Sequence, residues 1–371
     1  MKSIEGSGVR RMFDLIATMD RPINLSIGQA HYDAPEEVKA AAIRAIREGY
    51  NRYTVTEGMA SLCAATLDRL EEDRGYRPEA ILMTAGVSGG LLLSSMALLD
   101  PGDKVLLPDP YFVMYKNVLA LAGAEAEYYD LYPAGPGRPW RPDLDQLRAL
   151  IGPRTKAVLI NSPGNPTGGV WPAEMLGELV ALCREHGVWI LSDEIYEHFV
   201  YDAPFASIVP EMRGYDRVLA LGGFSKTYGI PGWRLGWAVG PEAVLEAMKI
   251  LQQYTFVCAP SPLQHGALAA LDVDMGARRD EYRAKRDLVH DRLAGRFDLV
   301  PSEGSFYAFP AYPRGWTEQE FVQACLEERV LVVPGSSFSR RDTHFRLSFA
   351  AEDDVLDAGL SVLCEIADRR R

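Results

Sequence analysis

One lysine stands among polar residues of complementary chemistry. Lys226 lies in GGFSKT (222–227), directly after an apolar run. Asn165 lies in NSPGNPTG, Asp193 and Tyr196 in SDEIY, and Arg234 in GWRLGW, and each motif follows or closes an apolar run. Together they supply an amine, an amide, a carboxylate, a phenol and a guanidinium. These are the groups needed to hold a phosphorylated aromatic aldehyde and to use it as an electron sink.

Lys226 is the candidate nucleophile of this set. A lysine attacks a carbonyl as its neutral amine, so burial or neighbouring cations must lower its pKa before a Schiff base can form. Asp193 ends an apolar strand, where an unpaired carboxylate is costly, and a protonated ring nitrogen would be a suitable partner. A solvated lysine and an N-cap carboxylate are the alternatives, and each residue taken alone leaves its alternative open.

Tyr196 and Asn165 can both hydrogen-bond an oxygen on a ring ligand. The spacing of three residues from Asp193 predicts that Tyr196 lies on the same side of a helical turn, although plain packing is the alternative. The run NPTG (165–168) is also a turn signal. Of the closely spaced Pro163 and Pro166, one is a candidate for a cis peptide bond.

Two features suit an anion such as a phosphate. Arg234 follows Lys226 by eight residues, and its guanidinium can grip a phosphate through two N–H groups. The run TAGVSGG (84–90) opens a helix directly after a strand, so free backbone N–H groups and the Ser88 hydroxyl would face an anion. A plain glycine turn is the alternative for this run.

Two further residues suit a ring and a carboxylate. Phe112, in DPYF (109–112), could stack on a ring ligand, although such a residue is more often part of a core. Arg346, in HFRLSFA (344–350), places a charge on an apolar strand. That charge needs a carboxylate partner, either from a ligand or from an internal salt bridge.

The elements that must position these residues alternate regularly from about residue 80. Short apolar runs predict strands at 81–84, 104–108, 125–130, 156–160, 188–193, 217–223 and 234–240, and helices are predicted at 91–99, 111–122 and 171–186. This pattern predicts an α/β fold in which helices cover a mostly parallel sheet. Ligands bind such sheets beyond the carboxyl ends of the strands, where Asn165, Asp193 and Lys226 fall.

The pattern changes after about residue 272. A long charged helix is predicted at 274–297, then a strand-like run at 306–312, a helix at 317–329, strand-like runs at 330–334 and 344–350, and a closing helix from Asp353. We therefore expect a large domain at 36–272, a smaller α+β domain at 273–371, and an N-terminal segment, 1–35, that packs with the small domain. The run 131–141 is rich in Pro and Gly and predicts an exposed loop.

Composition and missing motifs narrow the class of protein. The 371 residues carry a formal net charge of −12, which argues against nucleic acid or a membrane as a partner. The first 20 residues show no secretory signal, and the five widely spaced cysteines fit reduced thiols, so we expect a cytoplasmic protein. P-loop, GxGxxG, GxSxG and HExxH motifs are absent, and the six histidines lack metal-ligand spacing, so no metal site is expected.

The chain resembles a known family almost from end to end. The motifs that carry the resemblance are LSIGQAHYDAPEEV, NSPGNPTGGV, LSDEIYEHF, FSKTYGIPGWRLGW, VVPGSSF and RLSFA, in this order. They are similar to those of the fold type I pyridoxal-phosphate aminotransferases of class I/II, the aspartate-aminotransferase-like family. The resemblance implies pyridoxal 5'-phosphate as cofactor, amino acid and 2-oxo acid substrates, and a homodimer with its sites at the subunit interface.

The resemblance also implies a role for each motif residue. Lys226 would form the Schiff base and shuttle the proton, Asp193 would pair with the pyridine nitrogen, and Tyr196 and Asn165 would bond the ring oxygen. The remaining cofactor contacts would come from Arg234, Ser88, Ser225, the backbone at Val87, the stacked ring of Phe112, and Tyr53 reaching the partner subunit's phosphate. Arg346, Asn165 and the backbone of Gly28 would bind the substrate.

The chain departs from the family pattern at a few positions. Gly223 stands where many members have a serine, and Leu62-Cys63 stands where Leu-Arg is common. No second cation for a dicarboxylate is apparent, which argues against aspartate as the substrate. Gln29 to Tyr32, Tyr111 and Tyr254 are candidates for the side-chain pocket, and their mix favours a neutral or aromatic substrate.

Two other functions were weighed against an aminotransferase. A carbon–sulfur β-lyase or a cyclising synthase would use the same residues, so this alternative stays open. A cofactor-binding sensor would need an N-terminal DNA-binding domain, and the 20–30 residues before LSIGQ are too few for one.

Overall fold

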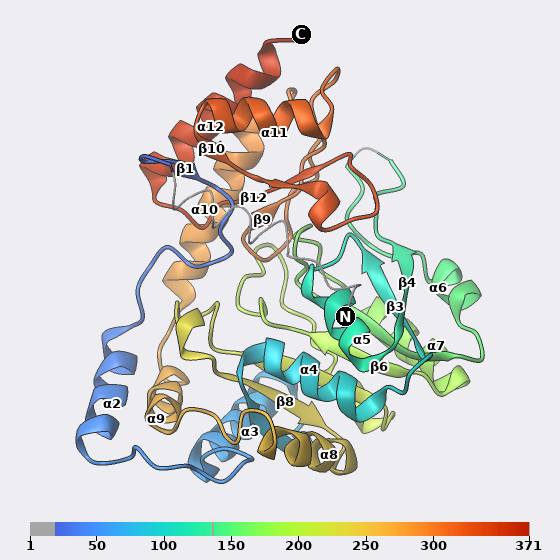
Figure 1. The fold of residues 1–371 in the computed structure, drawn as a ribbon, viewed down its shortest axis with the longest axis vertical. Coiled ribbons are helices and arrows are strands. Elements are labelled where there is room, and N and C mark those ends of the chain that lie inside the picture. The colour runs from blue at the N-terminus through green and yellow to red at the C-terminus, as the bar shows by residue number, and fades with distance from the viewer. Residues whose placement is uncertain (1–18, 136, 371) are drawn as a thin grey trace.

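A seven-stranded sheet forms the centre of the structure, a computed structural model that describes residues 19–135 and 137–370 (Figure 1). The strand order is β2-β8-β7-β6-β5-β3-β4. The strands are β2 (Ala80–Thr84), β3 (Lys104–Asp109), β4 (Glu125–Asp130), β5 (Thr155–Asn161), β6 (Trp189–Asp193), β7 (Val218–Gly223) and β8 (Gly236–Gly240). Of these strands, β8 alone runs opposite to the other six, which confirms the predicted α/β class with a mostly parallel sheet.

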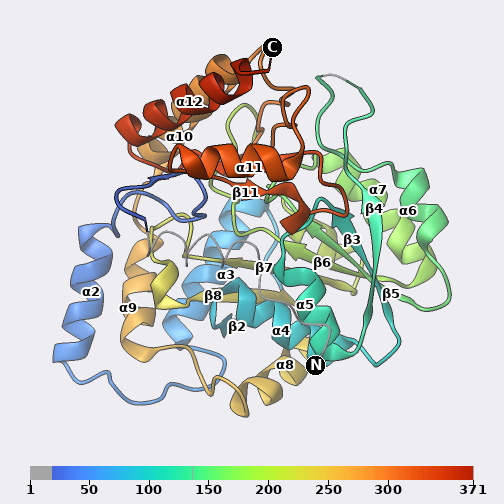
Figure 2. The ribbon, with the colours of Figure 1, turned by 45° about the horizontal axis from the view of Figure 1, so that its top comes forward.

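Alternate residues of the central strands are buried on opposite faces of this sheet. On one face, Leu159 and Leu191 pack with residues of α4 (Gly86–Leu98) and α5 (Met114–Ala122). On the other face, Val158 and Ile190 pack with residues of α3 (Ala60–Arg74) and α7 (Ala173–His186). Because helices cover both faces, these strands are apolar at every position rather than at every second one. Figure 2 shows the sheet between these helices.

The other helices of this part of the molecule lie around the sheet. They are α2 (Glu36–Arg47), α6 (Leu144–Leu150), α8 (Glu242–Gln253) and α9 (Ser261–Ala270). The helices α2 and α9 lie side by side, although more than 200 residues separate them in the sequence (Figures 1 and 2). The short 3-10 helices Val209–Arg213 and Pro231–Trp233 follow β6 and β7 respectively.

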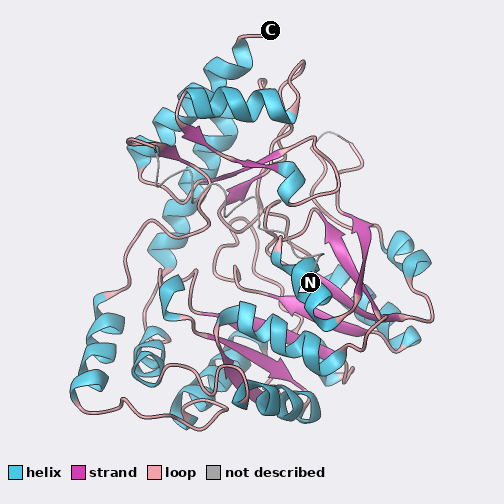
Figure 3. Ribbon diagram, in the orientation of Figure 1, coloured by secondary structure: helices cyan, strands magenta, loops and turns pink. Residues whose placement is uncertain are grey.

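The last hundred residues form smaller sheets and three long helices, away from the large sheet (Figure 3). The helices are α10 (Gly276–Leu293), α11 (Glu318–Glu327) and α12 (Asp353–Asp368). The strands β11 (Val333–Pro334), β12 (Phe345–Ser348) and β9 (Tyr307–Ala308) form an antiparallel sheet in that order, and the 3-10 helix Gly335–Ser337 follows β11.

The N-terminal segment joins this part of the molecule. The strand β1 (Ile23–Asn24) pairs in parallel with β10 (Val330–Leu331). This pairing is in keeping with the expected packing of segment 1–35, of which residues 1–18 lie outside the described residues. The division into domains at residues 35 and 272 stays a prediction.

Some predicted boundaries differ from the observed ones. The helix α4 begins at Gly86, five residues before the predicted start, because the glycines at 86, 89 and 90 are part of its first turns. The strand β8 begins after Arg234, which has a left-handed φ of 54° and cannot continue a strand. Both Ser162–Pro163 and Asn165–Pro166 are cis, where the sequence pointed to one.

The run 131–141 contains no helix or strand in its described residues, as predicted. Leu131 and Trp140 are nevertheless buried, so the loop is exposed only in part. Across the described ranges, no helix is both long enough and apolar enough to cross a bilayer.

Candidate active site

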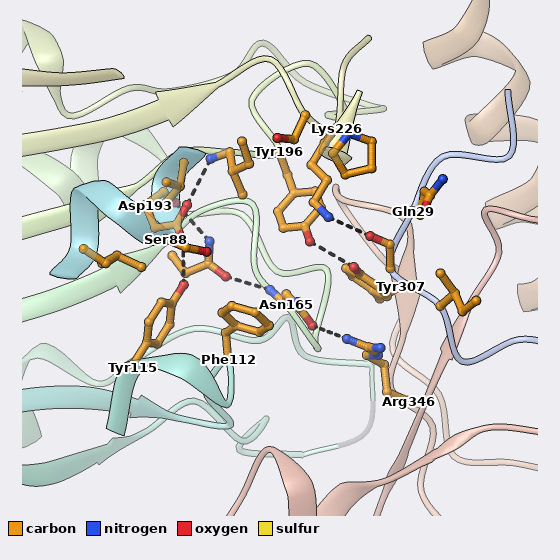
Figure 4. Close-up of a pocket in the computed structure, with 18 of the residues that line it drawn as sticks. Gln29, Ser88, Phe112, Tyr115, Asn165, Asp193, Tyr196, Lys226, Tyr307 and Arg346 are labelled. Carbon is orange, nitrogen blue, oxygen red and sulfur yellow. Dashed lines mark hydrogen bonds between the residues drawn. The ribbon is translucent and has the colours of Figure 1, made fainter. Parts of the chain in front are cut away.

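A cavity of about 290 Å³ lies where the carboxyl ends of β5, β6 and β7 meet β9, β12 and the N-terminal segment (Figure 4). The cavity brings together nearly all the residues predicted from the sequence. Its lining includes Gly28, Val87, Ser88, Phe112, Asn165, Asp193, Tyr196, Ser225, Lys226, Arg234 and Arg346. Tyr53 is the predicted site residue that the cavity of this chain does not include.

The amine of Lys226 is held inside the cavity. Its Nζ donates a hydrogen bond to the backbone oxygen of Gly28 over 2.6 Å. Burial, followed by the charges of Arg346 and Arg234, lowers the pKa of Lys226 from 10.5 to about 8, with Asp193 opposing the shift. Part of this amine is therefore uncharged near neutral pH, as a nucleophilic lysine requires.

Asp193 is a buried carboxylate that neutral donors hold in place. Its Oδ2 accepts a hydrogen bond of 2.8 Å from the Tyr115 hydroxyl, and its Oδ1 accepts one of 3.1 Å from the Ile195 N–H. Burial raises the pKa of Asp193 to about 6, against the opposing hydrogen bonds and Lys226. The bond to Ile195 resembles the capping role considered above, but a turn rather than a helix follows. A carboxylate in this position favours a cationic group as its ligand.

A short chain of hydrogen bonds connects the end of β5 to β12. The N–H of Asn165 donates to Asn161 Oδ1 over 2.8 Å, and Asn165 Oδ1 accepts a bond of 2.9 Å from Arg346. Tyr196 lies in the turn after β6, and its hydroxyl lies 2.9 Å from the Tyr307 hydroxyl. The amide nitrogen of Asn165 and the hydroxyl of Tyr196 thus both line the cavity as possible donors to a ligand.

The N-terminus of α4 meets Arg234 at one end of the cavity. No side chain caps this helix, so the N–H groups of its first turn lack intrahelical acceptors. Arg234 Nη2 donates to the backbone oxygen of Ala85 over 3.2 Å, which places the guanidinium beside that turn. A Cβ atom on Gly86 would lie 2.8 Å from this nitrogen, so the absence of a side chain permits the approach. The combination of a guanidinium with a helix N-terminus suits an anion.

Arg346 is almost completely buried, with 2% of its surface exposed, and it has no carboxylate partner among the described residues. Its Nη1 donates to Asn165, and its Nη2 donates to the backbone oxygen of Ser26 over 2.7 Å. Its Nε is buried without a partner. The internal salt bridge considered as an alternative is therefore not found, and the guanidinium retains an unused donor and an uncompensated charge.

Three of the candidates for the substrate pocket, Tyr32, Tyr111 and Tyr254, do not line the cavity of this chain. Tyr111 lies outside the cavity because its N–H bonds the Phe338 oxygen and its ring packs on Tyr128. Tyr254 is 85% exposed and lies outside the cavity of this chain. Of the run 29–32, Gln29 lines the cavity, whereas the Tyr32 hydroxyl bonds the backbone oxygen of Thr227 over 2.7 Å.

The sequence reasoning missed two tyrosines that line the cavity. Tyr115 follows Phe112 by three residues at the start of α5, and this helical spacing was a signal that both face the same side. Tyr307 lies on β9, within an aromatic run that reads as plain core. Within the described ranges, no cluster of three or more His, Cys, Asp or Glu residues is suited to a metal ion.

A buried lysine at the strand ends of an α/β sheet, opposite a carboxylate and near two arginines, defines a class of lysine-dependent cofactor enzymes. The profile of the family "Aminotransferase class I and II" matches residues 20–363, and the chain belongs to this family. The matching family and the names of the relatives show that the chain is an aminotransferase.

Individual relatives match over nearly their full length. The protein named "Probable aspartate aminotransferase" in Methanocaldococcus jannaschii is 34% identical, with 98% of each chain covered. Aromatic-amino-acid aminotransferase 2 of Thermococcus litoralis is 31% identical, over 100% of this chain and 98% of the relative. The solved structure of an aspartate aminotransferase from Thermotoga maritima is 32% identical with a TM-score of 0.92, over 99% of this chain and 98% of that one.

Proposed function

We propose that the cavity binds pyridoxal 5'-phosphate and uses it to move an amino group between a neutral α-amino acid and a 2-oxo acid. The observation that carries this proposal is the presence of a buried amine with a lowered pKa and a buried carboxylate in one cavity. Membership of the transferase family supports the reaction, and the geometry of the cavity supports the roles proposed for its residues.

The donor set of the cavity fits each part of this cofactor. Arg234, Ser88, Ser225 and the N–H groups at Val87 would hold the phosphate, since they combine a cation with a helix N-terminus. Asp193 would pair with the protonated ring nitrogen, and Tyr196 and Asn165 would donate to the ring oxygen. Phe112 would lie against the ring, because it lines the cavity beside Tyr115.

When bound, pyridoxal phosphate supplies an electron sink for the carbanion at the substrate's Cα. Lys226 would hold the cofactor and then move a proton between the substrate's Cα and the cofactor's C4′, for which its pKa of about 8 is suited. Arg346 would bind the substrate's α-carboxylate with its unused N–H, and the backbone of Gly28 would assist. The small-domain strands and the N-terminal segment would exclude water from this step.

The proposed substrate class follows from the charges of the cavity. The cations that line it are Lys226, Arg234 and Arg346, and each already has a task. The other lining residues include Ile27, Gln29 and Tyr307, which are uncharged. Relatives are named for aspartate and for aromatic amino acids. Among the described residues of this chain, no further cation lines the cavity, which supports a neutral side chain.

The role of Lys226 is tested by comparing Lys226→Ala with the control Lys104→Ala. Lys104 pairs with Glu127 and is the first residue of β3, at the end of the strand away from the cavity. We expect Lys226→Ala to lose the visible absorbance band of the cofactor-loaded protein and to lose at least ~1000-fold in turnover. Lys104→Ala should resemble the wild type. A retained band that sodium borohydride fixes to the Lys226→Ala protein would contradict the assignment.

A second assay separates the proposed reaction from the alternatives. The cofactor-loaded protein is mixed with each of a panel of amino acids, and the loss of its visible absorbance band is followed. Amino acids with neutral side chains should bleach this band more efficiently than aspartate. Release of pyruvate and ammonia from cystathionine without an oxo acid acceptor would favour the β-lyase, which no relative named above supports. The homodimer, the reach of Tyr53 into the partner's site and the cytoplasmic location stay predictions.

A further inference from the structure

Tyr307 occupies a central position that neither the motifs nor the proposed roles explain. It lies on β9, opposite Ser348 of the neighbouring strand β12, which also carries Arg346. Only 1% of its surface is exposed, and both its ring and its hydroxyl line the region between Gly28, Tyr196 and Arg346 (Figure 4). A residue that contacts three proposed site residues is placed to affect how they act.

The ring of Tyr307 covers one face of the Arg346 guanidinium. The guanidinium carbon lies 4.4 Å from the centre of this ring and 4.6 Å from the centre of the Phe338 ring. Since no carboxylate neutralises Arg346 in the described residues, these two rings add a cation–π attraction to the hydrogen bonds that Asn165 and Ser26 accept from it. They also hold the guanidinium plane in one orientation, with its hydrogen-bonding edge toward Asn165 and Ser26.

The hydroxyl of Tyr307 acts on the other half of the site. It lies 2.9 Å from the Tyr196 hydroxyl, and one of the two must donate to the other. If Tyr196 gives its proton to the ring oxygen of the cofactor, Tyr307 must be the donor within the pair. A donor to Tyr196 makes the Tyr196 hydroxyl a stronger donor in turn.

Gly28 leaves the space that this hydroxyl needs. A Cβ atom at Gly28 would lie 2.1 Å from the Tyr307 oxygen, which no side chain permits. The backbone oxygen of the same Gly28 accepts the hydrogen bond from Lys226. The N-terminal segment can therefore approach Lys226 only because residue 28 has no side chain beside Tyr307.

We propose that Tyr307 is a positioning residue that links the substrate side of the site to the cofactor side. Its ring orients Arg346 for the α-carboxylate, and its hydroxyl orients Tyr196 as a donor to the cofactor's ring oxygen. This inference rests on the proposed function, because it assumes that Tyr196 and Arg346 have the roles given above.

The first test removes the hydroxyl and keeps the ring. In the loaded wild-type protein the visible band titrates as the Lys226 nitrogen gains or loses its proton. When the Lys226 nitrogen is deprotonated, more negative charge stays on the cofactor's ring oxygen. A weaker hydrogen bond from Tyr196 to this oxygen therefore disfavours the deprotonated form. Tyr307→Phe should therefore raise the pKa of this titration by about 0.3 to 1 unit. Its affinity for 2-methylalanine, which has a carboxylate but no α-hydrogen, should stay within about twofold of the wild type.

The second test removes the ring. Tyr307→Leu should weaken the binding of 2-methylalanine, measured from the shift of the visible band, by roughly 3- to 30-fold, as expected for a lost cation–π contact. Because Tyr307→Phe keeps this affinity, the pair of variants separates the ring from the hydroxyl. A purely structural role would move neither the titration of Tyr307→Phe nor the order of the two affinities.

Tyr201 provides a matched control for both changes. Its buried hydroxyl donates to the backbone oxygen of Ser305, and its ring lies 5.2 Å from the Arg286 guanidinium, outside the cavity. Tyr201→Phe and Tyr201→Leu should leave the titration and the affinity unchanged. An unshifted titration in Tyr307→Phe, or an unchanged affinity in Tyr307→Leu, would overturn the inference. A wild-type protein without any visible band would instead overturn the proposed function.

Discussion

Asp193, Asp109 and Glu194 are all buried carboxylates, and of these three only Asp193 lines the cavity. Glu194, the next residue, points to Ser192, Ser207 and the N–H of Ile208 instead. Two adjacent acids thus have different tasks: one faces the ligand, and the other holds a loop.

A change of one atom in Asp193 tests its task. Asp193→Asn keeps the shape and removes the charge that would stabilise a protonated ring nitrogen. We expect kcat to fall about 100- to 1000-fold, the range for loss of a preorganised electrostatic partner. Asp109→Asn is the matched control, because Asp109 is buried at the end of β3 and bonds Ser339 outside the cavity. Steady-state kinetics that are equal for both variants would refute the proposed pairing.

The amine of Lys226 determines how recombination with the cofactor depends on pH. With a pKa of about 8, its neutral fraction increases roughly eightfold from pH 7 to pH 8.5 and then levels off. The rate constant for binding of pyridoxal phosphate to the cofactor-free protein should follow this curve in stopped-flow absorbance. A rate that keeps increasing tenfold per pH unit beyond pH 9 would indicate an ordinary exposed lysine.

The polar residues of the site were predictable as a set, because most of them follow an apolar strand or lie in a glycine-rich turn. Taken singly, each one also fits a structural role. Asn165, Asp193 and Lys226 are close in space for the reason the sequence implied, since β5, β6 and β7 are parallel neighbours. Tyr307 was not predictable, because an aromatic ring in an apolar run serves a core equally well. For Tyr115, the spacing of three residues from Phe112 was the one available signal. Their roles depend on where a hydroxyl points, which only the tertiary structure determines.

At the scale of elements, α4 contributes its first turn to the site, and Gly86 begins that turn. Gly86 has a φ of 68°, which side chains rarely adopt, and it lies against Arg234. Gly177 is a useful contrast, because it lies inside α7 with no atom near its missing Cβ.

The two glycines should respond oppositely to alanine. Gly86→Ala should lower the free energy of unfolding by about 1–2 kcal/mol, because a side chain is strained at this φ. It should also weaken the binding of pyridoxal phosphate, because the new Cβ displaces Arg234. Gly177→Ala should raise the free energy of unfolding by about 0.5–1 kcal/mol and leave the cofactor affinity unchanged. Urea unfolding and fluorescence titration measure the two quantities. Equal effects of both substitutions would show that Gly86 has no special role.

The start of α4 also shows why element boundaries were harder to predict than element types. Glycines at 86, 89 and 90 weaken a helical pattern, and the sequence therefore placed the helix only from residue 91. The structure keeps them because their neighbours leave no room: Gly90 faces Leu221, and Gly86 faces Arg234. Packing against the sheet thus outweighs the low helix propensity of these residues.

At the scale of the whole molecule, two neighbouring segments carry exposed apolar side chains. Tyr53 and Val55 are 83% and 64% exposed, and Tyr254 is 85% exposed. The two segments are joined where Gln252 donates to the backbone oxygen of Thr56 over 2.8 Å. Exposed apolar side chains on two neighbouring segments, here called the patch, are characteristic of an interaction surface, and a second copy of the chain is the expected partner.

A charge in this patch tests the predicted homodimer. Val55→Glu should shift the sedimentation equilibrium toward the monomer, because the acidic group would be buried between the copies. Cofactor affinity should fall with it if Tyr53 completes the partner's phosphate site. Leu121→Glu is the control, since Leu121 is 59% exposed at the end of α5 and outside the patch. A monomeric wild-type protein, or a Val55→Glu dimer as tight as the wild type, would contradict the expectation.

The hydrogen bond between Ser26 and Arg346 spans 320 positions of the chain. The ribosome synthesises Ser26 long before Arg346. For most of its synthesis, the nascent polypeptide therefore contains the N-terminal residues that line the pocket and lacks Arg346. The residues assigned to the cofactor in this chain's own cavity lie between 87 and 234, so only the carboxylate-binding end of the pocket has to wait for a nearly finished chain. Late closure of so distant a contact also favours slow final folding.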